Sequence, residues 1–126
     1  MRLCQMFLNG GELDGVRILS PRTVELMHTN VLPGNLAPAA ILGGNGFGLD
    51  FAIVQDQIAS GGYYGKGTFF WGGAAGTWFW IDPVNDLAVV GMIQQFATGN
   101  TGAAPVAAIP DVRGLSHTWV YQSFTK

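Results

Sequence analysis

The chain has 126 residues, of which 48% are hydrophobic and 11% charged, with six Lys and Arg residues and a formal net charge of -2. This length allows one domain or a part of one, and so few cations exclude the basic stripe that nucleic-acid binding requires. The apolar runs are far shorter than the roughly 20 residues that span a bilayer. The segment after Met1 lacks a convincing signal peptide. Cys4 is the one cysteine, so the chain cannot form an intrachain disulfide.

The first third of the chain predicts two short helices. Apolar residues recur with helical spacing over Leu3–Phe7, and Gly10-Gly11 is a natural helix stop. After a turn and an extended segment, Ser20 is expected to cap a second helix. Pro21 then takes the first helical position, where its missing N–H costs nothing.

The middle and last parts predict a sheet and one more helix. Apolar and smaller residues alternate over Phe47–Val54, which is typical of a strand with one apolar face. Three further strands are predicted, over Thr68–Trp71, Thr77–Ile81 and Leu87–Ile93. The last two are apolar on both faces, so we expect both sides of the sheet to be covered. Irregular segments over Leu32–Asn45 and Thr98–Pro110 are predicted to be loops.

The last helix is predicted to start at Pro110 and to carry Val112, Leu115 and Trp119 on one side. Two short helices and this one barely suffice to cover a sheet that is apolar on both faces. The charged fraction is also far below the roughly 25% of an average soluble domain. A layer contributed from outside these residues is the simplest explanation of both observations.

The most informative segment is Trp71-Gly72-Gly73-Ala74-Ala75-Gly76, followed by the aromatic strand and the turn at Asp82-Pro83. Glycines beside such a strand mark a place where backbone or ligand comes close. At the edge of a sheet, bare N–H groups there can reach an incoming oxygen atom.

Three blocks of the sequence, residues 8–21, 46–49 and 71–83, resemble in order and spacing the C-terminal part of the serine β-lactamase-like family. That family includes class C β-lactamases, DD-peptidases of the penicillin-binding-protein type and β-lactamase-like esterases. The resemblance implies an α+β fold, with an antiparallel sheet of about three to five strands, a C-terminal helix on one face and short N-terminal helices. It implies one segment, 1–126, in which residues 1–45 end a helical lobe and residues 46–126 form the sheet and the last helix.

The resemblance also implies a site. In the family, a nucleophilic serine and its lysine form Ser-x-x-Lys, a tyrosine comes from the helical lobe, and a third element lies on a strand that lines the cleft. Trp71-Gly72-Gly73 corresponds to the third element, and the backbone N–H of Ala74 to one of two oxyanion-hole donors. The glycines leave room for the substrate, because a Cβ at either position is expected to block its approach.

Trp71 stands where a β-lactamase carries lysine, and a tryptophan supplies apolar surface but no charge. The resemblance therefore favours an esterase-like protein, with a small acyl ester or amide as its substrate and no cofactor or metal. No convincing nucleophile is found in the chain. Ser123 and Lys126 match Ser-x-x-Lys, but at a frayed end and in the wrong order relative to Trp71. Cys4 is expected to be a buried hydrophobe, and His28 and His117 lack metal-ligand spacing.

Two hypotheses follow. In the first, the chain is the C-terminal portion of a serine hydrolase whose nucleophile lies outside these residues, so the isolated chain is inactive. In the second, it is a truncated, non-catalytic module that covers its apolar sheet with a second copy and binds a small apolar ligand among Trp71, Trp78 and Trp80. A secreted, periplasmic or cytoplasmic location is compatible with either hypothesis.

Overall fold

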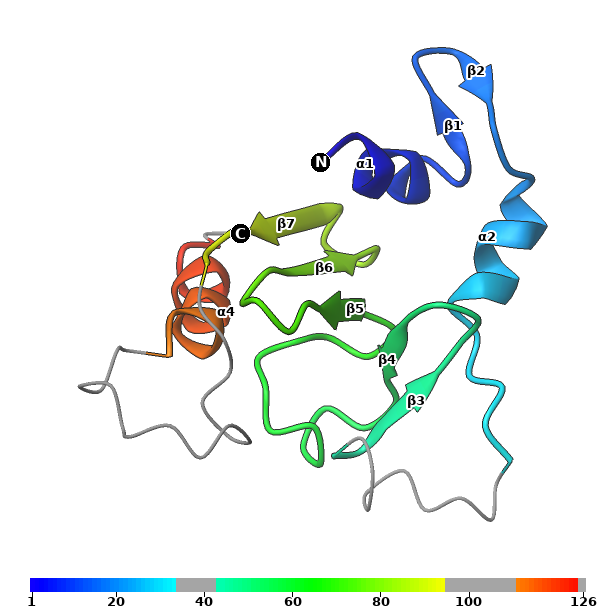
Figure 1. The fold of residues 1–126 in the computed structure, drawn as a ribbon. Coiled ribbons are helices and arrows are strands. Elements are labelled where there is room, and N and C mark those ends of the chain that lie inside the picture. The colour runs from blue at the N-terminus through cyan, green and yellow to red at the C-terminus, as the bar shows by residue number, and fades with distance from the viewer. Residues whose placement is uncertain (34–42, 95–110, 125–126) are drawn as a thin grey trace.

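The computed structural model describes residues 1–33, 43–94 and 111–124. It is an α+β fold built around one antiparallel sheet (Figure 1). The helices are α1 (Arg2–Leu8), α2 (Pro21–Met27) and α4 (Val112–Gln122), and the strands are β1 (Glu12–Leu13), β2 (Val16–Arg17), β3 (Asn45–Phe47), β4 (Ala52–Val54), β5 (Phe69–Gly72), β6 (Trp78–Asp82) and β7 (Leu87–Gly91).

The main sheet has five strands in the order β3-β4-β5-β6-β7, and every neighbouring pair is antiparallel. A sheet in which each strand pairs with the next along the chain needs only hairpin connections. The β1–β2 hairpin forms a separate two-stranded sheet after α1. The fold expected from the resemblance, an antiparallel sheet with a C-terminal helix and short N-terminal helices, is confirmed.

One face of the sheet packs against α1 and α2. The ring of Phe7 in α1 meets Phe51 and Phe69 edge-on, with ring centroids 5.2 and 5.9 Å apart. Ile53, Ile81 and the partly buried Phe79 belong to the same cluster. Edge-to-face aromatic pairs of this kind add about 0.5–1.5 kcal/mol to what area burial supplies.

The other face of the sheet packs against α4. Trp78 and Trp80 are buried there with Val54 and Tyr64, and residues of α4 pack onto them. Because side chains alternate along a strand, Trp80 and Phe79 point to opposite faces, and β6 is apolar on both. The expectation that both sides of the sheet are covered is therefore correct for β6.

The prediction of one strand over Phe47–Val54 is wrong. The segment is a hairpin of β3 and β4, and the Gly48 N–H donates to the Phe51 carbonyl at 2.8 Å across the reversal. A Cβ at Gly48 would collide with the backbone carbonyl of Met27, so only glycine allows the chain to turn against α2. The alternating pattern persists through the turn and hides the reversal.

The predicted inner side of the last helix is only partly right. Val112 packs onto the sheet, but Leu115 and Trp119 are exposed. Val120 and Tyr121 take their place, because Tyr121 packs through its ring and donates a hydrogen bond from its hydroxyl to Asp82 at 2.7 Å. Most of the two predicted loops, Leu32–Asn45 and Thr98–Pro110, lies outside the described residues.

Candidate active site

The end of β5 has one free edge. β5 pairs with β6 along its whole length, from Phe69 opposite Ile81 to Gly72 opposite Trp78. On its other side, β4 pairs only with Phe69 and Phe70. The β4 ladder therefore stops before Trp71 and Gly72, and this edge of the backbone is left open.

A tight turn follows the free edge and joins β5 to β6. The Gly73 N–H donates to the Thr77 carbonyl at 2.7 Å, and the Gly76 N–H donates to the Gly73 carbonyl at 3.0 Å. Gly76 has φ +92°, a value that L-residues rarely adopt, which explains glycine at this position. Ala74 is the second residue of the turn and is exposed, and its N–H takes part in neither of these bonds.

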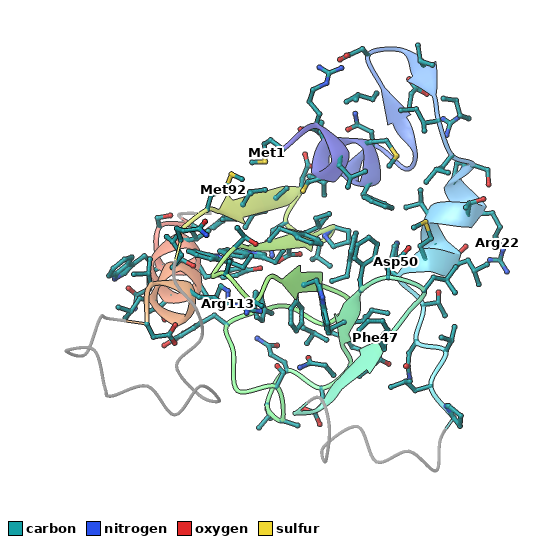
Figure 2. All side chains as sticks on the ribbon, viewed as in Figure 1. Met1, Arg22, Phe47, Asp50, Met92 and Arg113 are labelled. Atoms are coloured by element: carbon teal, nitrogen blue, oxygen red, sulfur yellow. The ribbon has the colours of Figure 1, made fainter. Side chains whose placement is uncertain are left out.

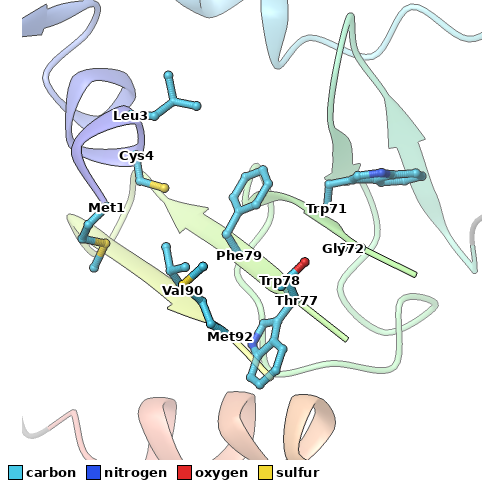
Figure 3. Close-up of a pocket in the computed structure, with 12 residues that line it drawn as sticks. Met1, Leu3, Cys4, Trp71, Gly72, Thr77, Trp78, Phe79, Val90 and Met92 are labelled. Atoms are coloured by element: carbon cyan, nitrogen blue, oxygen red, sulfur yellow. The ribbon is translucent and has the colours of Figure 1, made fainter. Parts of the chain in front are cut away.

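An apolar pocket of about 410 Å³ opens beside this turn, on the face of the sheet that carries α1 (Figure 3). Trp71, Gly72 and Gly73 form one side of it. Phe79 lies between Trp71 and Cys4 of α1. The remaining lining residues are Met1, Leu3, Thr77, Trp78, Val90, Gly91 and Met92. The three motif residues predicted to contact substrate are thus brought together at one pocket.

Trp71 forms a rigid side of this pocket. The residue is 45% exposed, and its ring meets Phe47 of β3 edge-on with the ring centroids 5.1 Å apart. This contact restrains the indole, and nearly half of the residue stays exposed. An aromatic wall held in this way binds apolar groups with little loss of side-chain entropy.

The two glycines of the motif have close neighbours within the protein itself. A Cβ at Gly72 would stand 2.5 Å from Nη1 of Arg113, and a Cβ at Gly73 would overlap the Thr77 hydroxyl. Both neighbours are the ends of side chains that can shift, so these contacts alone do not require glycine at either position. Arg113 was not among the residues that the sequence singled out, since one arginine near the start of a helix carries no spacing signal.

Tyr64 and His117 form a hydrogen-bonded pair against Trp80, on the α4 side of the sheet. Burial, aided by the nearby Arg113 guanidinium, lowers the pKa of His117 to about 4. Burial also raises the pKa of Tyr64 well above its usual range. At neutral pH the pair is therefore an uncharged imidazole and a protonated phenol, which suits packing rather than proton abstraction.

A family model described as Beta-lactamase matches residues 2–111. The chain belongs to the β-lactamase family. Protein Rv1367c of Mycobacterium tuberculosis strain H37Rv is 39% identical over 116 residues, which cover 86% of this chain and 29% of that protein. Uncharacterized protein MT1414 of strain CDC 1551 matches equally well. The chain thus spans less than a third of the length of these curated relatives.

Solved structures agree with membership of the β-lactamase family. EstCE1, a hydrolase with promiscuous acyltransferase activity, is 30% identical with a TM-score of 0.57, covering 70% of this chain and 22% of that one. A mutant of the simvastatin synthase LovD from Aspergillus terreus is 25% identical with a TM-score of 0.54, and the match covers 70% of this chain and 25% of that one. Both matches concern a part of a larger protein.

The other residues weighed as nucleophiles or ligands in this β-lactamase-family chain lie elsewhere. The Ser123 hydroxyl donates to the Val120 carbonyl in the last turn of α4, and Lys126 lies outside the described residues. Cys4 is buried, and burial raises the pKa of its thiol. His28 stacks on Phe69 on the α1 side of the sheet, whereas His117 is on the α4 side.

The described residues contain neither a metal-binding cluster nor a membrane-spanning helix. No group of three or more His, Cys, Asp and Glu side chains in 1–33, 43–94 and 111–124 is arranged to hold a metal ion. Within the same ranges, none of the helices has the length and apolar character needed to cross a membrane.

Proposed function

We propose that this chain supplies part of the active site of a β-lactamase-like serine hydrolase that is more esterase-like than lactamase-like. The observation that carries the proposal is the position of the Ala74 N–H. It lies outside the hydrogen bonds of its turn, directly after Trp71-Gly72-Gly73 and next to an apolar pocket. In this proposal the Ala74 N–H is an oxyanion-hole donor, and Trp71, Gly72 and Gly73 line the substrate cleft.

Such a donor accelerates acyl transfer because it stabilises charge that develops on the carbonyl oxygen in the transition state. Removal of one donor typically lowers kcat by about 10²–10³-fold. A backbone N–H in a tight turn suits this role, since its direction is fixed by the turn and needs no side-chain ordering. The nucleophilic serine and its lysine, in this proposal, come from outside these 126 residues.

The apolar character of the site favours an ester with an apolar acyl or alcohol group. Trp71, Phe79 and Val90 present carbon surface to the pocket. The acyl-transfer activity named for EstCE1 and the synthase activity named for LovD are consistent with an acyl-enzyme mechanism at this kind of site. The proposed substrate class is accordingly a small acyl ester or amide.

A hybrid enzyme tests the proposal. This chain replaces the matched segment of EstCE1, and hydrolysis of 4-nitrophenyl butyrate is followed. Ala74→Pro removes the donor, and proline is favoured at the second position of a β-turn. We expect kcat to fall by about 10²–10³-fold, whereas Ala74→Ser, which keeps the N–H, retains activity near that of the parent hybrid.

A fluorophosphonate, which tags activated serines, separates the outcomes of this test. Intact-mass measurement is expected to show one adduct on the hybrid and none on the isolated 126-residue chain. A hybrid that is tagged and active but indifferent to Ala74→Pro would remove Ala74 from the mechanism. An adduct on Ser123 of the isolated chain would place the nucleophile within these residues.

The second hypothesis, a non-catalytic module that pairs with a second copy, is favoured by one observation. Large apolar side chains are exposed at the pocket rim, and Met92 is 80% exposed. Its ligand site needs correction, because Trp80 is fully buried under α4 on the face opposite Phe79 and Trp71. Any apolar ligand of this module would therefore bind at Trp71 without Trp80.

A further inference from the structure

The side chain of Thr77 brings a polar group to the apolar pocket beside the motif. Thr77 directly precedes β6 and lines the pocket. Because side chains alternate along a strand, Thr77 points to the same face as Phe79, which also lines the pocket. Figure 3 shows the Thr77 oxygen on the side of the strands that carries Phe79 and Trp71. A hydroxyl is thus placed among the carbon surface that the proposed substrate contacts.

The turn between β5 and β6 sets the position of this hydroxyl. The Gly73 N–H donates to the Thr77 carbonyl at 2.7 Å, so the two residues face each other across the turn. A Cβ on Gly73 would overlap the Thr77 Oγ1 atom. Since Gly73 has no side chain, the motif strand leaves the hydroxyl uncovered. Ala74, whose N–H is the proposed oxyanion donor, is the next residue along the chain.

The Thr77 hydroxyl is available to a ligand. No hydrogen bond of this side chain is found within residues 1–33, 43–94 and 111–124, and Thr77 is only partly buried. By contrast, the hydroxyl of Thr23 is bonded to Ser20, and that of Thr29 donates to the Glu25 carbonyl. A threonine hydroxyl donates one hydrogen bond and accepts two. All of this capacity at Thr77 is directed to what enters the pocket.

The surroundings of the Thr77 hydroxyl favour a neutral binding partner. None of the described residues that line the pocket has a charged side chain. Figure 2 shows Met1 and Met92 at the pocket, Arg22 and Asp50 at the other side of the molecule, and Arg113 on α4. An ionic group would lose hydration at an apolar wall, which is costly without a counter-charge. A ligand hydroxyl is neutral and both donates and accepts, so it can pair with a threonine hydroxyl in either direction.

We propose that Thr77 is a specificity-determining residue that binds a hydroxyl on the acyl group of the substrate, so that the site accepts hydroxyacyl esters. The inference rests on the proposed hydrolase site, because it names the substrate class of that site. With the carbonyl oxygen of the ester at the Ala74 N–H, the first carbons of the acyl group lie beside Gly73 and the Thr77 hydroxyl. The substrate hydroxyl is therefore expected a few bonds from the ester, as in a 3-hydroxyacyl group.

Binding to the 126-residue chain tests the proposal without any need for turnover. The probes are methyl 3-hydroxybutyrate and methyl 3-methylbutyrate, in which a methyl group of similar size replaces the hydroxyl. NMR titration follows the backbone amides of Gly73 and Thr77. Thr77→Val keeps the shape of the side chain and removes its hydroxyl. We expect this variant to bind methyl 3-hydroxybutyrate about fivefold more weakly, as the loss of one neutral hydrogen bond predicts, and methyl 3-methylbutyrate no more weakly than before.

Two further variants separate the hydroxyl from a general effect on the fold. Thr77→Ser keeps the hydroxyl and is expected to retain the binding of methyl 3-hydroxybutyrate. Thr118→Val is the matched control, because Thr118 is also partly buried but lies in α4, away from the lining residues. Circular dichroism checks that each variant is folded.

Three results would overturn the proposal. One is that the unmodified chain does not bind methyl 3-hydroxybutyrate. Another is that Thr77→Val changes the binding of the two probes equally or leaves both unchanged. The third is that Thr118→Val weakens the binding of methyl 3-hydroxybutyrate as much as Thr77→Val does.

This proposal and the proposed function fail separately. If binding of the hydroxylated probe depends on Thr77 but the EstCE1 hybrid is insensitive to Ala74→Pro, the hydroxyl subsite stands and the oxyanion role does not. If the hybrid depends on Ala74 but Thr77→Val affects both probes alike, the hydrolase stands and the substrate class is wrong.

Discussion

At the scale of single residues, Asp82 joins the sheet to the last helix. It is fully buried at the end of β6, where one carboxylate oxygen accepts the N–H groups of Val84 and Asn85. The other oxygen accepts the Tyr121 hydroxyl from α4 and the Asn85 side-chain amide. One acidic residue thus shapes a hairpin turn and also fixes the helix that presents Arg113.

We expect Tyr121→Phe to lower the free energy of unfolding by about 1–3 kcal/mol, because the buried carboxylate loses a donor that no water replaces. Urea unfolding followed by circular dichroism measures the change. Tyr63→Phe is the matched control, since the Tyr63 side chain is largely exposed. A loss of similar size in both variants would show that the Tyr121–Asp82 bond contributes little.

Gly91 in β7 has no room for a side chain because an aromatic ring lies against it, and not because of its own backbone conformation. A Cβ there would overlap the indole of Trp78, its partner across the β6–β7 pair. We expect Gly91→Ala to destabilise the fold by about 1–3 kcal/mol through overpacking and to shift the emission of the displaced tryptophan. Gly65→Ala is the comparison, because its Cβ would make only an ordinary contact, 3.8 Å from Asp82. Equal melting temperatures of the two variants would contradict this explanation.

At the scale of elements, α4 depends on a histidine that must stay uncharged. His117 packs between Tyr64 and Trp80, and burial, aided by Arg113, lowers its pKa to about 4. As the pH falls, His117 of the unfolded chain therefore takes up a proton near pH 6.5, whereas His117 of the folded chain takes one up only at a lower pH. Stability that is complete above that pH is lost as the pH falls toward 4.

The measurement is the free energy of unfolding as a function of pH. We expect it to decrease from about pH 6.5 to about pH 4, and the decrease to become smaller in His117→Gln. Part of the dependence should remain, because burial also lowers the pKa of His28. An identical pH profile for the variant would show that the pKa of His117 is the same in the folded and unfolded chains.

Local signals predicted the elements well wherever they were self-contained. Ser20 accepts the Thr23 N–H at 3.0 Å with Pro21 behind it, as the cap pattern indicates. Local signals could not predict the β3–β4 reversal. Glycine is needed at position 48 because the Met27 carbonyl of α2, which is distant in sequence, leaves no room for a Cβ. The same limit applies to the site: Trp71-Gly72-Gly73 was visible as a motif, whereas Arg113 reaches it only through the docking of α4.

At the scale of the whole molecule, the low fraction of charged residues is matched by large apolar side chains that stay exposed. The sheet is covered by α1 on one face and by α4 on the other, yet Leu3, Met92 and Trp119 stay exposed. The chain also spans only 29% of the length of its curated relatives. Exposed apolar side chains of this kind are where we expect other protein to bind.

This surface yields a prediction for the isolated chain, which should associate with itself through the pocket rim when nothing else covers it. Leu3→Gln combined with Met92→Gln removes two exposed apolar side chains there and should weaken the association by about tenfold. Val84→Gln is the control, because Val84 is equally exposed but lies in the β6–β7 turn. Sedimentation velocity over a range of concentrations measures the effect. If Val84→Gln weakens association as much as the rim variant does, the contact between copies is not specific to the pocket. A second copy would then not cover the surface that the rest of a hydrolase is proposed to cover.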